Sequence, residues 1–131
     1  GVKFLLVHGS PRKNNEDILP DTPLSEVEKM LENVDADVVL CGHTHIPCGF
    51  QTESRKTVVN AGSIGRTFFV EPNSYPKACY LIIEVDNGSC VFQHQFVEYD
   101  KEQASEKLAA REFEGADKLA GMLINPEIRH F

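Results

Sequence analysis

The first forty residues combine two kinds of hydrophobic pattern. Residues 2–7 are largely apolar and contain no turn residue, so they predict a buried strand that delivers His8 at its carboxyl end. Gly9 and Pro11 break that strand, and residues 12–23 are polar with two further prolines. This composition predicts a long surface loop of the kind that carries function.

A helix is predicted next, because apolar residues recur three and four positions apart over residues 24–34. Ser25 and Glu28 offer a capping box at its start. Residues 38–41 form a second apolar run that stops at a glycine, which predicts another strand. Strand, helix and strand together predict a crossover between parallel neighbours, with both strand ends at one edge of an α/β sheet.

The rest of the chain is predicted to hold further strands followed by helices. Residues 56–60 have the pattern of a strand that leads into a glycine-rich turn. Residues 77–86 and 89–99 predict a β-hairpin, because the Asn-Gly pair between them favours the positive φ angles of a tight turn. Residues 100–123 are rich in Ala, Glu, Lys and Leu, which predicts one or two surface helices.

Length and composition indicate a single globular domain over residues 1–131. The apolar fraction is 41% and the charged fraction 25%, and no apolar run approaches the length of a membrane span. The net charge of −7 argues against unspecific binding of nucleic acid, which needs clustered basic residues. A phosphate substrate remains compatible with this charge, because bound divalent cations can reverse the sign of the local field.

The four cysteines are predicted to be reduced and mostly buried. They are Cys41, Cys48, Cys79 and Cys90, and no two of them have the spacing of a zinc knuckle. No secretory signal is visible, and we therefore expect a cytoplasmic protein.

Candidate metal ligands lie at the two predicted strand ends. His43 and His45 follow Gly42 directly, and in a regular strand residues two apart would share a face. Neutral imidazole is the commonest metal ligand among side chains. Taken alone, His8 is better interpreted as a strand-end residue hydrogen-bonded to the backbone, but its expected place beside His43 favours a metal site. His94 alternates with phenylalanines and is predicted to lie on a hairpin face.

Three segments carry a family resemblance. They are Val7-His8-Gly9-Ser10-Pro11, Val39-Leu40-Cys41-Gly42-His43-Thr44-His45-Ile46-Pro47 and Val59-Asn60-Ala61-Gly62-Ser63-Ile64-Gly65-Arg66. In this order the chain resembles the second half of calcineurin-like metallophosphoesterases, most closely the small bacterial and archaeal phosphodiesterases. The resemblance covers roughly residues 2–99, so that residues 100–131 form a helical tail.

The resemblance implies an α/β/β/α sandwich that holds two divalent metal ions, often Mn, Fe, Ni or Zn. By motif matching, His8 and His43 would bind one ion and His45 the other. Such a pair of ions activates a hydroxide for the hydrolysis of phosphodiesters or phosphomonoesters. The partner expected for the site is thus a small phosphoester substrate.

The motifs of the family's first half are absent from the chain. No Asp-x-His, Gly-Asp or Gly-Asn-His occurs in it, so no catalytic residue is identified here and the carboxylate ligands are expected from elsewhere. Gly1 is not an initiator methionine and a strand follows at once, which fits a fragment whose amino-terminal half is missing or supplied separately.

Substrate contacts are predicted at three further positions. Ser10 and Arg12 follow His8 in the long loop, and Arg66 follows the turn at residues 60–65; guanidinium groups complement phosphate. A solvated surface and a turn that needs Gly62 and Gly65 are the plainer interpretations.

Three functions remain open. The leading one is phosphoester hydrolysis by a longer protein of which this chain is the carboxyl-terminal half. The alternatives are a non-catalytic protein-interaction scaffold on the same fold, and a structural zinc site whose emptying would unfold the domain.

We expect the isolated chain to bind metal weakly and not to hydrolyse phosphodiesters, because three histidines divided between two ions leave both coordination shells incomplete. The measurement is release of p-nitrophenol from bis-p-nitrophenyl phosphate by the purified chain with Mn²⁺. Measurable turnover would overturn this expectation.

Overall fold

A four-stranded mixed sheet forms the centre of the molecule, as given by a computed structural model that describes residues 1–68 and 77–127. Its strands are β1 (Phe4–Leu6), β2 (Val38–Cys41), β3 (Cys48–Gln51) and β4 (Thr57–Asn60), in the spatial order β1-β2-β4-β3. β1, β2 and β4 run parallel, and β3 pairs with β4 in the antiparallel sense. The predicted parallel pairing of the first two strands is therefore confirmed.

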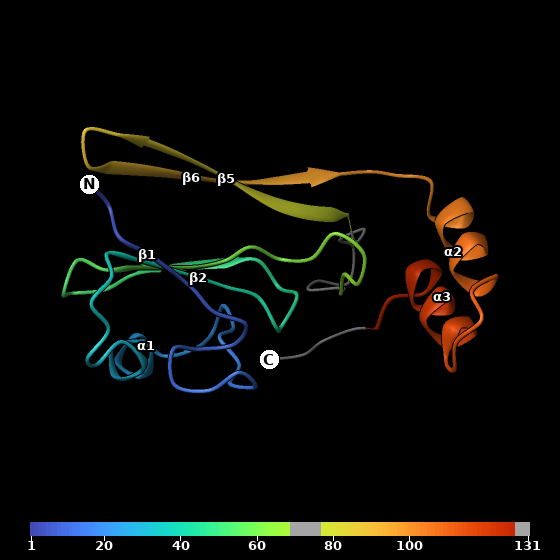
Figure 1. Ribbon diagram of the computed structural model, residues 1–131, viewed down its shortest axis with the longest axis horizontal. Coiled ribbons are helices and arrows are strands. Elements are labelled where there is room, and N and C mark those ends of the chain that lie inside the picture. The colour runs from blue at the N-terminus through green and yellow to red at the C-terminus, as the bar shows by residue number, and fades with distance from the viewer. Residues whose placement is uncertain (69–76, 128–131) are drawn as a thin grey trace.

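Helix α1 (Leu24–Met30) covers one face of this sheet (Figure 1). It buries Val27 and Met30 against the sheet because these positions lie on one side of the helix. The hydrophobic core between the two consists of Ile18, Val27, Met30, Leu31, Val39, Cys41 and Val58. The long loop after β1 contributes Ile18 to this core, so the loop is anchored at that point.

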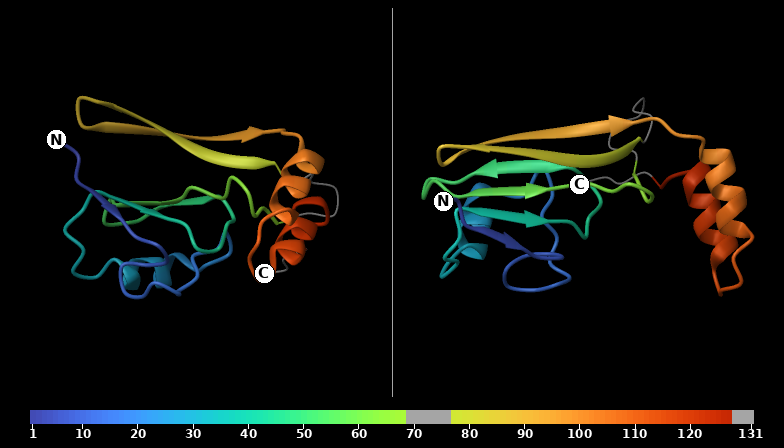
Figure 2. Two further views of the ribbon diagram at one scale, coloured as in Figure 1. Left: turned by 45° about the vertical axis from the view of Figure 1, so that its right-hand side comes forward. Right: turned by 45° about the horizontal axis from the view of Figure 1, so that its top comes forward.

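A β-hairpin lies over the opposite face of the sheet, as the two views in Figure 2 show. It consists of β5 (Ala78–Asp86) and β6 (Ser89–Val97), and its turn has Asn87 and Gly88 at φ angles of 46° and 83°. The predicted hairpin and its Asn-Gly turn are thus confirmed. The layers follow the order helix, sheet, hairpin, in agreement with the predicted mixed α/β fold.

Two helices follow the hairpin and pack against each other. They are α2 (Lys101–Ala109), capped by the side chain of Asp100, and α3 (Ala116–Ile124). Both lie beyond the end of the hairpin and not over its outer face (Figure 1). Among the described residues, no helix has the length and apolar character needed to cross a bilayer.

Strand β1 is more exposed than the sequence indicated. Residues 2–7 were expected to form a buried strand, yet only Phe4–Leu6 are in the strand, and their side chains are 37% exposed at Phe4 and 72% at Leu6. The physical reason is position: β1 pairs with β2 on one side and forms the edge of the sheet on the other.

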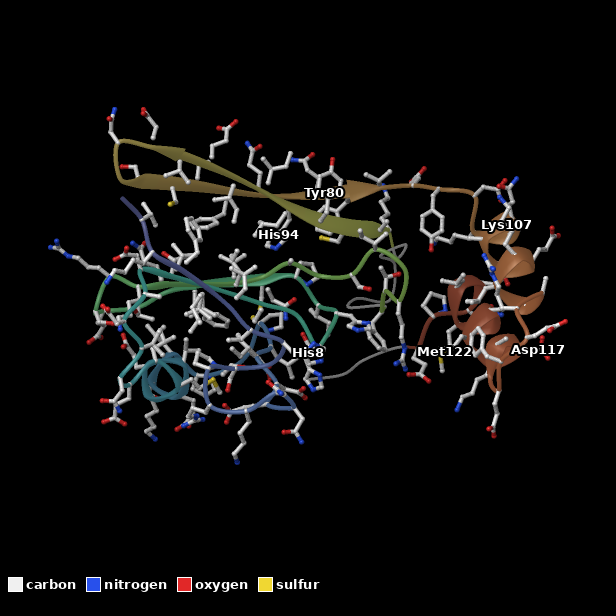
Figure 3. The ribbon with its side chains drawn as sticks, in the orientation of Figure 1. His8, Tyr80, His94, Lys107, Asp117 and Met122 are labelled. Carbon is white, nitrogen blue, oxygen red and sulfur yellow. The ribbon has the colours of Figure 1, made fainter. Side chains whose placement is uncertain are left out.

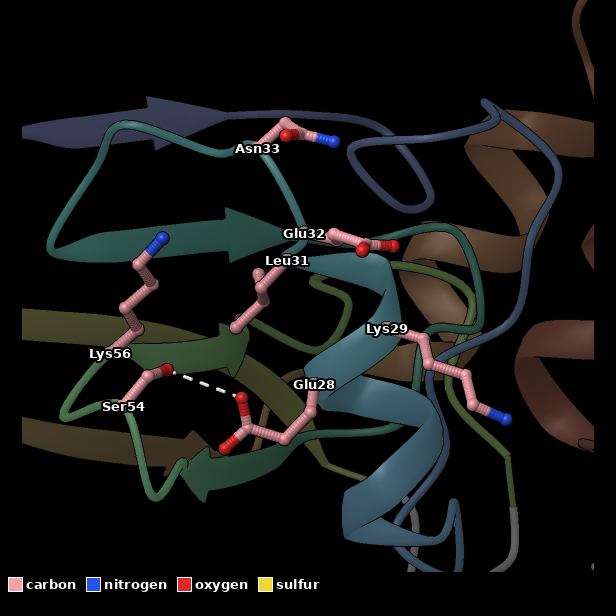
Figure 4. A pocket seen from close by; sticks show the side chains of 7 residues that line it. All are labelled: Glu28, Lys29, Leu31, Glu32, Asn33, Ser54 and Lys56. Carbon is pink, nitrogen blue, oxygen red and sulfur yellow. Dashed lines mark hydrogen bonds between the residues drawn. The ribbon is translucent and has the colours of Figure 1, made fainter.

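The helix and the strand after β2 also differ from expectation. α1 ends at Met30, earlier than its hydrophobic pattern suggested, and Pro23 precedes it without any side-chain cap. The carboxylate of Glu28 does not form a capping box. It accepts a hydrogen bond from the Glu53 amide at 2.6 Å and one from the Ser54 hydroxyl at 3.2 Å, which Figure 4 shows. β3 was not predicted, because it is only four residues long and contains a glycine.

All four cysteines are free, two of them buried and two half-buried. Burial raises the pKa of Cys41 to about 12 and that of Cys48 to about 11, and each thiol lies near the other. These thiols are therefore protonated side chains of the core and not nucleophiles.

Substitution of Gly62 by alanine tests the turn after β4. Gly62 has a φ of 78°, and a Cβ atom there would lie 2.9 Å from the Cys79 sulfur. We expect Gly62→Ala to lower the free energy of unfolding by about 1–3 kcal/mol, measured by urea denaturation. Gly65→Ala is the control, because Gly65 has no positive φ and open space around it. Equal stability of the two variants would contradict this account of the turn.

Candidate metal centre

The carboxyl ends of the parallel strands bring the candidate ligands to one edge of the sheet. Pairing continues past the strands proper, since the Val7 amide donates to the Leu40 carbonyl at 2.9 Å. The Gly42 amide then donates to the His8 carbonyl, also at 2.9 Å. His8 and His43 therefore leave neighbouring strand ends side by side, as the sequence predicted (Figure 3 labels His8).

The two imidazoles of His8 and His43 approach each other through one nitrogen each. His8 Nε2 lies 3.0 Å from His43 Nδ1, and the ring centroids are 4.9 Å apart at an interplanar angle of 67°. Two ring nitrogens from different strands thus meet at one point. This is the arrangement that two histidine ligands of one ion require, and their predicted role as ligands remains a prediction.

The backbone at His43 and His45 is in an unusual conformation. Their φ angles are 65° and 63°, in the left-handed region that residues with a Cβ rarely adopt. The expectation that they share a face of a regular strand is therefore wrong: residues 42–47 form an irregular loop between β2 and β3. Backbone strain of this kind costs on the order of 1–3 kcal/mol per residue and concentrates at functional sites.

His45 contacts a different segment from His43. Its Nδ1 lies 2.8 Å from the Arg66 carbonyl oxygen, and its ring centroid is 5.9 Å from that of Phe68. A carbonyl only accepts hydrogen bonds, so Nδ1 carries the proton and, in the neutral ring, Nε2 carries the lone pair. The guanidinium of Arg66 lies 5.5 Å above the Phe68 ring and 3.9 Å from Glu127.

Asn60 and Thr44 support the loop of residues 42–47, called the histidine loop, through buried hydrogen bonds. Asn60 is fully buried, and its side-chain amide donates to the Gly42 carbonyl at 2.7 Å and to the Thr44 hydroxyl at 2.9 Å. Its side-chain oxygen accepts from the Gly62 amide at 3.0 Å. One side chain therefore connects the histidine loop to the turn after β4.

The sequence did not reveal this role of Asn60, which was interpreted only as the start of a turn. A polar residue at the buried end of an apolar strand was the available signal, because such a group needs partners. His94 adds a further connection, as its Nε2 lies 2.7 Å from the Asn60 backbone carbonyl. Figure 3 shows His94 on the hairpin face that is turned toward the sheet, as the alternation of residues predicted.

Ser10 and Arg12 are engaged within their own loop. The Ser10 hydroxyl donates to Glu16 and accepts from the amides of Arg12 and Lys13 at 3.0 and 3.1 Å. The Arg12 guanidinium donates twice to Glu16, at 2.6 and 3.1 Å. These hydrogen bonds from Arg12 and Ser10 hold the pKa of Glu16 below its usual range. The predicted contact of both residues with substrate remains a prediction.

Asp17 is an acidic loop residue in contact with the histidine pair. Its Oδ1 lies 3.3 Å from His43 Nε2, the ring nitrogen on the side away from His8. Sequence patterns gave no sign of this contact, because it joins a loop residue to a strand end. Over residues 1–68 and 77–127, no three His, Cys, Asp or Glu side chains are grouped as a metal site. Within these residues the structure thus brings His8, His43 and Asp17 near one another, and their role as a metal site stays a prediction.

The chain matches the model of the calcineurin-like phosphoesterase superfamily domain over residues 1–88. It belongs to this superfamily. No curated protein matches the chain at a significant level.

Two solved structures resemble the chain over most of its length. A hypothetical protein from Pyrococcus horikoshii OT3 is 26% identical with a TM-score of 0.69, and the match covers 91% of this chain and 46% of that one. A metallophosphoesterase from Sphaerobacter thermophilus is 21% identical with a TM-score of 0.67, covering 95% and 55% respectively. The chain thus spans about half the length of these proteins, and the likeness to the second agrees with the metallophosphoesterase fold.

Replacement of Asn60 tests the connection between the histidine loop and the core. We expect Asn60→Ala to lower the free energy of unfolding by about 3 kcal/mol, because buried polar groups lose their partner. It should also shift the NMR signals of the His43 and His45 backbone amides. Asn15→Ala, at an exposed loop position, is the control and should leave both unchanged. Unshifted amides at His43 and His45 in Asn60→Ala would contradict the role assigned to Asn60.

Proposed function

We propose that this chain is the histidine side of a two-metal phosphoesterase centre, which hydrolyses small phosphodiesters or phosphomonoesters in the complete protein. The observation that carries the proposal is the approach of His8 Nε2 to His43 Nδ1 at 3.0 Å from two adjacent strand ends. Membership of the superfamily supports the reaction class. The proposal also includes small phosphoesters as the substrate, two divalent metal ions as cofactors and a cytoplasmic location.

The donor set fits divalent ions such as Mn, Fe, Ni or Zn. His8 Nε2 and His43 Nδ1 would hold one ion, and His45 Nε2 the other, because hydrogen bonding fixes the proton of His45 on Nδ1. Bound ions of this kind polarise phosphoryl oxygens and lower the pKa of water. The chain's own contribution is to hold the His43 and His45 nitrogens on a loop with left-handed backbone that Asn60 and Thr44 support. His8 lies at the neighbouring strand end, beside His43.

The proposal places the remaining ligands on the other half of a longer protein, and the edge of the sheet offers that half a place to dock. Among the described residues, β1 is the last strand at this edge of the sheet, and Phe4 and Leu6 are exposed there. A further strand from the other half of a longer protein would bury them and complete the sheet. The lengths of the two similar structures, about twice the matched part, support this arrangement.

Among the three predicted substrate contacts, Arg66 is the best placed. Its carbonyl accepts a hydrogen bond from His45 Nδ1. Its guanidinium lies over the ring of Phe68, which is a neighbour of the His45 ring. A phosphate held at the His45 side would thus lie within reach of a planar cation, which suits its recognition. Ser10 and Arg12 would have to give up their bonds to Glu16 before they could contact a substrate.

A scaffold function is the second candidate, favoured by exposed apolar residues on the hairpin. Tyr80, Ile82 and Val91 are all exposed on it, and patches of this kind mark interaction surfaces. A scaffold gives no reason for left-handed backbone at His43 and His45, so the enzyme is the better supported of the two.

The complete protein that contains this chain should hydrolyse bis-p-nitrophenyl phosphate or p-nitrophenyl phosphate when Mn²⁺ is supplied. We expect His8→Ala and His43→Ala each to lower kcat by more than about 100-fold, because loss of a ligand exceeds the 10- to 100-fold effect of losing an outer-shell partner. Gln93→Ala, at an exposed position of the hairpin, is the control and should stay within a few-fold of the native rate. Native activity in both alanine variants would refute the proposal.

A further inference from the structure

We propose that Asp17 is a positioning residue for His43: its carboxylate accepts a hydrogen bond from Nε2–H, which leaves Nδ1, the nitrogen that faces His8, with the lone pair that can bind a metal ion. This inference rests on the proposed function of the histidine pair and deepens it. It adds to the site an acidic residue from a loop that no motif indicated.

The geometry at His43 engages both ring nitrogens from opposite sides. Asp17 Oδ1 lies 3.3 Å from Nε2, and His8 Nε2 lies 3.0 Å from Nδ1. A neutral imidazole has one N–H, and an ionised carboxylate can only accept. The proton therefore belongs on Nε2, and Nδ1 has its lone pair directed toward His8.

The loop before Asp17 follows a fixed path. The amide of Ser10 donates to the Lys13 carbonyl at 2.9 Å, and the Ser10 hydroxyl is bound to Glu16. A Cβ atom at Gly9 would lie 2.6 Å from the Asn14 carbonyl oxygen, so only glycine allows this turn. The residue directly before Asp17 is thus held by both Ser10 and Arg12.

The residue after Asp17 is anchored as well. Ile18 is 2% exposed in the core, and its carbonyl accepts from the Thr44 hydroxyl at 3.5 Å. Thr44 is the neighbour of His43 in the chain. Asp17 and His43 are therefore connected twice, by the hydrogen bond between their neighbours Thr44 and Ile18 and by the contact of their own side chains. Their separation is thus set by the fold.

Asp17 has half of its side chain exposed, with a relative accessibility of 50%. Water screens an interaction at such a position, so its main effect is on orientation and not on net stability. The φ of 65° fixes where the His43 ring leaves the backbone, and the carboxylate fixes which nitrogen faces His8. The Arg66 carbonyl does the same for His45. Carboxylates and carbonyls hydrogen-bonded to ligand histidines are a general feature of metal sites.

The first arm of the test reads the proton position without metal. The ¹⁵N-labelled 131-residue chain is studied near pH 8, where imidazoles are mostly neutral, by two-bond ¹H–¹⁵N correlation spectra. We expect His43 to be the Nε2–H tautomer in the native chain and in Asp17→Asn, whose amide oxygen still accepts. Asp17→Ala should give a mixture of tautomers, and Asp21→Ala, which removes an exposed charge from the same loop, should match the native chain.

The second arm titrates the same four samples with Zn²⁺, following the His8 and His43 ring signals. We expect Asp17→Ala to weaken Zn²⁺ binding about 10- to 100-fold relative to Asp21→Ala, with Asp17→Asn in between. An unchanged His43 tautomer in Asp17→Ala would overturn the inference, and so would equal Zn²⁺ affinity of the two alanine variants. Absence of Zn²⁺ from His8 and His43 in the complete protein would instead refute the proposed metal centre, while the tautomer arm, which needs no metal, tests the inference separately.

Discussion

The parallel pairing of β1 with β2 is the constraint on which the site depends. It continues through the hydrogen bond from the Gly42 amide to the His8 carbonyl at 2.9 Å, so two residues far apart in sequence leave the sheet together. The side chains of His8 and His43 meet because the sheet brings their backbones side by side. The contacts beyond the strand ends set the directions in which the histidine rings point.

That refinement comes from buried polar groups and not from the hydrophobic core. Asn60 connects the Gly42 carbonyl, the Thr44 hydroxyl and the Gly62 amide with a single side chain. Such a network is stable only when every member has a partner, which makes the loop conformation specific. The left-handed backbone at the two histidines costs free energy, and this network offsets it.

Periodicity and motifs predicted much of the fold. The strand-helix-strand unit, the hairpin with its Asn-Gly turn and the meeting of His8 with His43 all follow from local pattern and topology. The exposure of Leu6 could not be predicted, because an edge strand and a central strand can share the same apolar run. The contact of Asp17 with His43 could not be predicted either, since loop paths depend on details such as the close approach at Gly9.

The central claim is that His8 and His43 serve one metal ion. Anomalous scattering from Zn²⁺ in crystals of the complete protein tests it most directly. The account predicts a zinc peak at about 2.0–2.1 Å from both His8 Nε2 and His43 Nδ1. Zinc that contacts neither of these two nitrogens, or only one of them, would contradict it.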